Sequence, residues 1–261
     1  MVRRDVIHVD AADPITVSDL TMAYGSFVLQ RDLNFAVKQG DIFVVMGGSG
    51  CGKSTLMRHV LGLNEPAQGE VFYRGESFTR AEPERREELL QRIGVLYQSG
   101  ALWSSLTLAE NVSLPLEEFT DLTAAQMRDV AALKLALVGL AGFEDYYPSQ
   151  ISGGMQKRAG LARAMALDPE VLCIDEPSAG LDPISSRLLD ELIVGLRDSL
   201  GTTFVIVTHE LQSIFDVGSN SVFLDAETRT MIAMGPPKEL RDHSDNPTVR
   251  RFLTRGEAAS V

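Results

Sequence analysis

A run of glycines, a lysine and a serine at fixed spacing has the clearest chemistry in this 261-residue sequence. The residues from Gly47 to Ser54 read GGSGCGKS, which fits the phosphate-loop pattern G-x-x-x-x-G-K-[ST]. Glycines let the backbone curl so that successive N–H groups point inward, and a helix that begins near Lys53 adds the positive end of its dipole. In such a loop Lys53 reaches the β and γ oxygens of a nucleotide, and the Ser54 hydroxyl binds Mg²⁺. The candidate nucleotide ligands are Gly47, Gly48, Ser49, Gly50, Cys51, Gly52, Lys53, Ser54 and Thr55.

The segments on either side of this loop favour a phosphate site over a flexible Gly/Ser turn. The apolar run at residues 42–46 (IFVVM) predicts a buried strand directly before the loop. Leu56, Met57, Val60 and Leu61 have the spacing of one helix face directly after it. Because the motif binds nucleotide phosphates when it lies between a strand and a helix, the sequence predicts nucleotide binding.

Two adjacent carboxylates, Asp175 and Glu176, follow a second apolar run at residues 171–174 (VLCI). A run of this kind is typical of a central strand in a parallel sheet, and ligands bind at the carboxyl ends of such strands. Asp175 could hold the hydration shell of Mg²⁺, and Glu176 could polarise an attacking water. Helix capping explains the pair equally well when it is taken alone. His209 ends the predicted strand 202–208, where a lone histidine is usually structural.

Two further motifs each leave two interpretations open. Ser152-Gly153-Gly154-Met155 precedes a helical pattern, so it predicts either a serine N-cap or a second helix N-terminus that meets phosphate. Tyr24 stands beside a turn in the predicted hairpin 15–37, where its ring could stack on adenine or pack against the sheet.

The remaining patterns indicate an α/β fold. They predict strands at 69–75 and 93–97, a solvated helix at 83–92 and a closing hairpin from 221–224 and 230–234. Helical patterns without a convincing strand fill residues 99–159 and predict a helical subdomain inserted into the α/β core.

Composition limits the class of protein. A net charge of −12 argues against a general affinity for nucleic acid, and no apolar run approaches the roughly 20 residues that span a bilayer. The charged N-terminus does not resemble a signal peptide, so we expect a cytoplasmic protein. Cys51 lies near Lys53 and a helix N-terminus, which should lower the pKa of its thiol. We therefore expect Cys51 to be alkylated before Cys173 and to be protected by ATP.

Taken together and in order, these elements resemble the nucleotide-binding subunit of ABC transporters across nearly the whole chain. The resemblance implies a P-loop NTPase core of ABC type with an antiparallel β subdomain and an inserted helical subdomain. The single domain 1–261 would comprise a core (15–98 and 160–235), a helical subdomain (99–159), and a C-terminal helix and tail (236–261). The implied catalytic residues are Glu176, His209 and Lys53; the implied metal ligands are Ser54, Gln98 and Asp175; the further nucleotide contacts are Tyr24, Gln98, Ser152, Gly153, Gly154 and Asp182.

A narrower resemblance is to the ATPases of MCE-associated (Mla-type) phospholipid transport systems. It rests on the runs QSGALW from Gln98, ENV from Glu110, PL from Pro115, ISGGM from Ile151 and GLDPI from Gly180. Met155 departs from the widespread signature, which has glutamine there, but Ser152 and the backbone N–H groups are retained, so we expect activity. Some relatives grip the neighbouring subunit with a C-terminal extension; little follows Arg255, which places that contact in doubt.

The resemblance also implies cofactors and partners. ATP and Mg²⁺ would lie between two subunits of a homodimer, and closure would drive integral membrane permease subunits together with a lipid-binding MCE-type protein, at the inner face of the membrane. Trp103 would contact a permease helix or be buried in its own subdomain. Alternatives are the ATPase of a small-solute importer and a non-transport ABC protein, although this chain lacks a long coiled coil and a second cassette. A GTP-dependent switch would need an N-K-x-D motif, which is not found.

Overall fold

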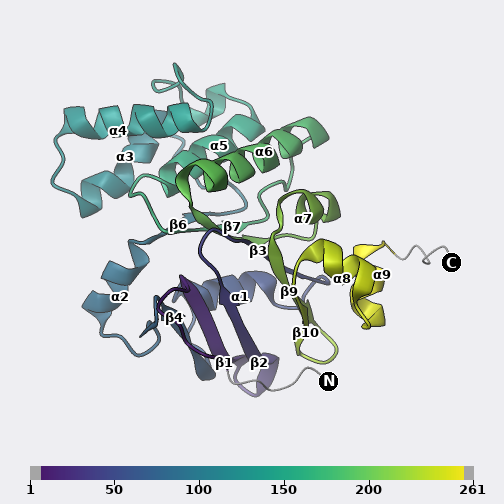
Figure 1. The fold of residues 1–261 in the computed structure, drawn as a ribbon. Coiled ribbons are helices and arrows are strands. Elements are labelled where there is room, and N and C mark those ends of the chain that lie inside the picture. Colours follow the sequence, from purple (N-terminus) through teal and green to yellow (C-terminus); the bar gives the residue numbers. More distant parts are fainter. Residues whose placement is uncertain (1–6, 256–261) are drawn as a thin grey trace.

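Two β-sheets organise the fold in the computed structural model, which describes residues 7–255 (Figure 1). A four-stranded antiparallel sheet has the order β2-β1-β4-β5, and a six-stranded sheet has the order β10-β9-β3-β8-β7-β6. Strands β9, β3, β8, β7 and β6 are mutually parallel, and β10 pairs antiparallel with β9. The strands are β1 (Ile15–Tyr24), β2 (Phe27–Val37), β3 (Ile42–Gly47), β4 (Gln68–Tyr73), β5 (Glu76–Ser77), β6 (Ile93–Leu96), β7 (Val171–Asp175), β8 (Thr203–Val207), β9 (Asn220–Asp225) and β10 (Thr230–Met234).

Helices cover both faces of the six-stranded sheet (Figure 1). Helices α3 to α6 lie above it in the view of Figure 1, and α1 lies below it beside the antiparallel sheet. The helices are α1 (Lys53–Val60), α2 (Pro83–Leu90), α3 (Leu108–Phe119), α4 (Ala124–Leu137), η1 (Pro148–Gln150), α5 (Gly153–Ala164), α6 (Pro183–Leu200), α7 (Leu211–Val217), α8 (Pro237–His243) and α9 (Pro247–Leu253).

Successive side chains of the central strands alternate between two hydrophobic clusters, one on each face of the sheet. On β7, Cys173 packs with the antiparallel sheet and α1, whereas Leu172 and Ile174 pack with α3 to α6. Successive side chains of a strand point to opposite faces, so a continuous apolar run is what a strand covered on both sides requires. The predicted central strand and both predicted hairpins are thereby confirmed.

The C-terminal part of the chain differs from the prediction of one helix and a tail. It forms two helices, α8 and α9, because Pro247 cannot continue the first one and Asn246 caps the second by accepting from Thr248 and Val249 N–H groups. Residues 256–261 of the predicted tail lie outside the described residues. The short helix α7 was not predicted, and α5 crosses the expected boundary at residues 159 and 160.

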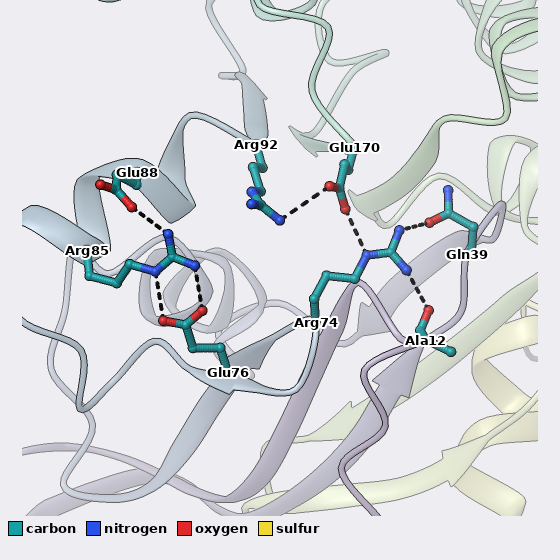
Figure 2. Close-up of polar contacts among 8 residues, drawn as sticks. All are labelled: Ala12, Gln39, Arg74, Glu76, Arg85, Glu88, Arg92 and Glu170. Atoms are coloured by element: carbon teal, nitrogen blue, oxygen red, sulfur yellow. Dashed lines mark hydrogen bonds and ion pairs between the residues drawn. The ribbon is translucent and has the colours of Figure 1, made fainter.

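An ion-pair network joins the two sheets at the amino ends of the parallel strands (Figure 2). Arg74, in the turn after β4, donates from Nε to Glu170 at 2.8 Å, and it also contacts Gln39 and the Ala12 carbonyl. Arg92 lies 3.6 Å from the same carboxylate, directly before β6. A neighbouring cluster in the same view consists of Arg85, Glu76 and Glu88. This network holds the sheets together at the end opposite the phosphate loop.

Candidate functional site

The phosphate loop connects the buried strand β3 to α1, as predicted. Gly47 has a φ of 148°, and a side chain there would place Cβ 2.3 Å from the Leu224 carbonyl oxygen, so only glycine fits. The Lys53 ammonium folds back and donates to the carbonyl oxygens of Gly47 and Gly48, both at 3.0 Å. The loop therefore places a largely buried cation beside its own backbone.

Ser54, the first-turn residue of α1, meets the end of β7. Its hydroxyl donates to Asp175 Oδ1 at 3.1 Å, although the two residues are 121 positions apart. Burial raises the pKa of the Asp175 carboxyl, while the Ser54 hydrogen bond and the charges of Arg58 and Lys53 oppose that shift. A hydroxyl and a carboxylate are oxygen ligands of the kind that Mg²⁺ prefers, so this pair fits a magnesium site.

Glu176 and His209 meet beside that pair. His209 Nδ1 lies 2.7 Å from Glu176 Oε1. Glu176 has a positive φ of 49°, and its N–H donates to the Val207 carbonyl at 2.8 Å, which fixes the turn at the end of β7. Both residues line a cavity of about 520 Å³, together with Ser178 and Gly180.

Two helix N-termini lie apart from the phosphate loop. Ser152 caps α5 by accepting from the Met155 N–H at 3.3 Å, and Asp182 caps α6 by accepting from the Ile184 and Ser185 N–H groups at 3.0 Å. Hydrogen bonds from Ser185 lower the pKa of Asp182. Within residues 7–255, no hydrogen bond or ion pair links either cap to the phosphate loop.

The remaining candidates are accessible. Tyr24 ends β1 at the tip of the hairpin and is 54% exposed, which leaves its ring available for stacking. Gln98 follows β6 and is exposed. The structure thus gathers the phosphate loop, Asp175, Glu176 and His209 at the carboxyl ends of β3, β7 and β8, and leaves the two helix caps outside that group.

The expected lowering of the Cys51 pKa was wrong. The thiol is 1% exposed, and burial raises its pKa despite the Lys53 ammonium 4.0 Å away. The loop folds this side chain inward, against Gly47, so desolvation outweighs the nearby positive charge. Cys173 is also buried, and its pKa is raised to about 12.

Trp103 is 62% exposed, which excludes burial in its own subdomain. Buried Asn111 holds the loop: its Oδ1 accepts from the Trp103 N–H at 2.7 Å, and its Nδ2 donates to the Trp103 carbonyl at 3.1 Å. An apolar cavity of about 330 Å³ separates α2 and β6 from α3 and α5, lined in part by Leu90, Val95 and Phe119.

Sequence reasoning missed two buried polar residues that act on the site. Gln30 on β2 donates from Nε2 to the Cys51 carbonyl at 2.7 Å and to the Asp225 carbonyl at 2.9 Å, so it bridges the phosphate loop and β9. Lys157 on α5 contacts the backbone of Gln98. A glutamine at an inward position of an alternating strand was a usable signal for the first; the helical spacing of Lys157, Gly160 and Arg163 was one for the second.

The fold and site define a nucleotide-binding cassette of the P-loop class. Its features are a glycine-rich loop between a buried strand and a helix, a hydroxyl paired with a strand-end carboxylate, and an inserted helical subdomain. The sequence profile of the ABC transporter family matches residues 30–179. The chain belongs to the ABC transporter family, as its ATP-binding cassette, and the predicted family, fold class and type of enzyme, an ABC ATPase, are confirmed at that level.

Several curated proteins are similar over most of the chain. The "probable ribonucleotide transport ATP-binding protein mkl" of Mycobacterium tuberculosis is 38% identical over 239 residues, covering 92% of this chain and 66% of that protein. The chain therefore spans about two thirds of the length of this mycobacterial relative. The intermembrane phospholipid transport system ATP-binding protein MlaF of Haemophilus influenzae is 37% identical over 244 residues, covering 94% of this chain and 91% of MlaF.

Solved structures share the fold. The cbiO1 protein of Clostridium perfringens, described as part of the ABC transporter complex cbiONQ, superimposes with a TM-score of 0.82 at 26% identity, covering 89% of this chain and 92% of cbiO1. The ATP-binding cassette MJ0796, a dimer bound to ADP and Pi, has a TM-score of 0.75 at 26% identity, covering 85% of this chain and 98% of MJ0796.

Across residues 7–255, we find no helix with both the length and the apolar character needed to cross a membrane.

Proposed function

We propose that ATP hydrolysis by this chain powers a membrane transporter of phospholipid. The observation that supports hydrolysis is the Glu176–His209 contact of 2.7 Å. It lies at the carboxyl ends of β7 and β8, on the same edge of the sheet as the phosphate loop. The similarity to MlaF along 94% of the chain supports phospholipid as the transported class.

Each gathered residue has a chemical role in this proposal. Lys53 and the loop N–H groups bind the β- and γ-phosphates, which releases the Lys53 ammonium from its own backbone carbonyls. Glu176 accepts a proton from the attacking water as general base. His209 holds that carboxylate in place, and Tyr24 stacks on adenine.

Mg²⁺ is the proposed metal cofactor. Ser54, Asp175 and Gln98 would hold it, and the oxygen atoms of Ser54 and Asp175 are already within hydrogen-bond distance of each other. The cation would neutralise charge on the β- and γ-phosphate oxygens. Asp175 must be ionised for this role. Burial raises its pKa, so the charge of the bound cation, together with those of Lys53 and Arg58, would be needed to favour the ionised form.

A complete site requires a second copy of the chain. Ser152, Gly153 and Gly154 form a helix N-terminus suited to phosphate, yet they share no bond with the phosphate loop of their own subunit within the described residues. We infer that they bind the γ-phosphate held by a partner subunit, with Asp182 at the same interface. The dimeric MJ0796 cassette supports this arrangement.

The proposed partners beyond the dimer are integral membrane permease subunits and an MCE-type lipid-binding protein. Trp103 and the apolar cavity between α2 and α3 are the two proposed contact points for the permease, because an exposed tryptophan and an apolar pocket each suit an interface. The chain would then lie on the cytoplasmic face of the membrane, bound through the permease and without nucleic acid.

The proposed division of the single domain assigns one role to each part of the chain. Residues 15–98 and 160–235 bind and hydrolyse nucleotide, residues 99–159 contact partners, and residues 236–261 are the C-terminal segment, which contains α8 and α9. A second candidate substrate class is a small solute such as a ribonucleotide, which the name of the mycobacterial relative supports.

Purification of the chain from membranes with its permease distinguishes the two. We expect phospholipid in the extracted complex by mass spectrometry, and ATPase activity that Glu176→Gln lowers by roughly two to four orders of magnitude. A complex that hydrolyses ATP, contains no enriched phospholipid and is stimulated by ribonucleotides would refute the phospholipid assignment alone.

A further inference from the structure

Helix α5 contains a buried lysine whose contacts join two parts of the site. Lys157 is 6% exposed. Its ammonium donates to the main-chain carbonyl of Gln98 and lies 3.5 Å from the carbonyl oxygen of Glu176. One side chain therefore contacts the backbone at the ends of β6 and β7.

Burial of the Lys157 ammonium costs desolvation free energy, which an apolar side chain of similar size would not cost. Lys157 makes no ion pair with a carboxylate in the part of the chain that the structure describes. Burial lowers its pKa, and the charges of Asp175 and Glu176 oppose that shift. A methionine could fill a similar volume without desolvating a charge, so the two carbonyl contacts are the feature that lysine adds.

The same face of α5 fixes the loop that contains Gln98. A side chain at Gly160 would place Cβ 3.0 Å from the Gly100 carbonyl oxygen, so the helix and the loop lie in close contact. Arg163 donates to the carbonyls of Ala101 at 2.6 Å and Gly100 at 3.2 Å. Lys157, Gly160 and Arg163 recur every three residues, which places them on one side of the helix. The loop must therefore follow any displacement of α5.

The backbone at Glu176 is held from two directions. Its N–H donates to Val207 on β8, and its carbonyl faces Lys157 on α5. Because φ at Glu176 is 49°, a region that residues with side chains rarely adopt, this turn depends on its surroundings to keep the carboxylate aimed at His209.

We propose that Lys157 is a positioning residue that ties the signature helix α5 to Gln98 and Glu176 within one subunit. The inference rests on the proposed function, because it assigns a role to Lys157 in ATP hydrolysis. When nucleotide bound to a partner subunit contacts the N-terminus of α5 and shifts this helix, Lys157 moves the backbone of Gln98 and Glu176 with it. Occupation of one half-site is thereby coupled to the catalytic carboxylate of the other.

The test compares three variants of the full chain. Lys157→Met keeps the volume and removes the donors, and Lys157→Arg keeps donors. Lys134→Met is the matched control, since Lys134 is equally buried in the helical lobe but pairs with Asp168, away from the site. We expect Lys157→Met to lower kcat about tenfold, and at least about threefold, because a small misplacement of catalytic groups has effects of this size.

The other readouts separate positioning from general damage. KM for ATP and the Kd of a fluorescent ATP analogue should stay within about threefold for Lys157→Met, and Lys157→Arg should recover most of the lost kcat. Hydrogen exchange should quicken in peptides covering residues 97–101 and 175–179 in Lys157→Met and remain unchanged there in Lys134→Met.

Each outcome decides the proposal. A kcat for Lys157→Met within about threefold of wild type, or an equal loss in Lys134→Met, overturns it. If Lys157→Met does not fold, Lys157→Leu, which also lacks donors, replaces it, and an unchanged kcat in that variant also overturns the proposal. A wild-type chain that does not hydrolyse ATP would instead refute the proposed function.

Discussion

His209 Nδ1 lies 2.7 Å from Glu176 Oε1, across 33 positions of sequence, at the adjacent ends of β8 and β7. The histidine side chain is 70% exposed, whereas the glutamate side chain is 14% exposed. The contact therefore orients a largely buried carboxylate from its solvent side. This geometry suits a base that must point at one water molecule.

Glu176→Gln should lower kcat for ATP hydrolysis by roughly two to four orders of magnitude and leave ATP affinity within a few-fold. The amide can still orient water, but it cannot accept the proton. The variant should accumulate as an ATP-bound dimer, which size-exclusion chromatography with ATP and Mg²⁺ will detect. Glu210→Gln is the neighbouring control, and full activity in Glu176→Gln would exclude Glu176 as the base.

Trp103→Ala should weaken binding to the permease without unfolding the chain. The side chain is 62% exposed, and Asn111 holds the loop through main-chain atoms that the substitution retains. We expect a melting temperature close to wild type and a reduced pull-down with the membrane subunit. Leu133→Ala, which removes another exposed apolar side chain of the helical lobe, should bind normally. A large loss of melting temperature with intact permease binding would contradict the docking role.

The stability of the chain should depend on Asp190, which links α6 to α7. Ser213 Oγ donates to Asp190 Oδ1 at 2.5 Å inside the core, and burial raises the pKa of Asp190 to about 6. The folded state therefore keeps a proton on Asp190 that the unfolded state releases near its ordinary pKa of 3.8. The contribution of Asp190 to the free energy of unfolding is most favourable at low pH and is lost as pH rises through about 6.

Asp190→Asn imitates the protonated side chain and keeps the oxygen that accepts from Ser213. We expect it to melt a few degrees above wild type at about pH 8, with a smaller difference at about pH 5. Differential scanning fluorimetry across that range will measure the gap, with Asp121→Asn as the control at an exposed position. A gap that widens as pH falls would show that the sign is wrong.

Both thiols should react slowly with maleimide in the native chain. Cys51 and Cys173 are 1% and 0% exposed, and burial raises the pKa of each. Labelling should therefore require opening of the loop or of the sheet, and ATP should slow it further at Cys51. Mass spectrometry of labelled peptides will report the rates. Labelling of Cys51 as fast as that of a free thiol would contradict this placement.

The sequence by itself determined the elements whose signals are local. The loop from Gly47 to Ser54 specifies its own curvature, because glycine positions and a following helix are read within about ten residues. The apolar run before Asp175 specified a central strand for the same reason. The order of these motifs along the chain was sufficient to indicate the family.

The tertiary structure alone decided which side chains meet and what their surroundings do to them. Ser54 reaches Asp175 across 121 positions, and Lys157 reaches Gln98 across 59, so no local pattern encodes either contact. Cys51 shows the consequence most clearly. Its neighbours in sequence favour a thiolate, but the fold excludes water from the thiol, and desolvation depends on the whole three-dimensional environment rather than on adjacent residues.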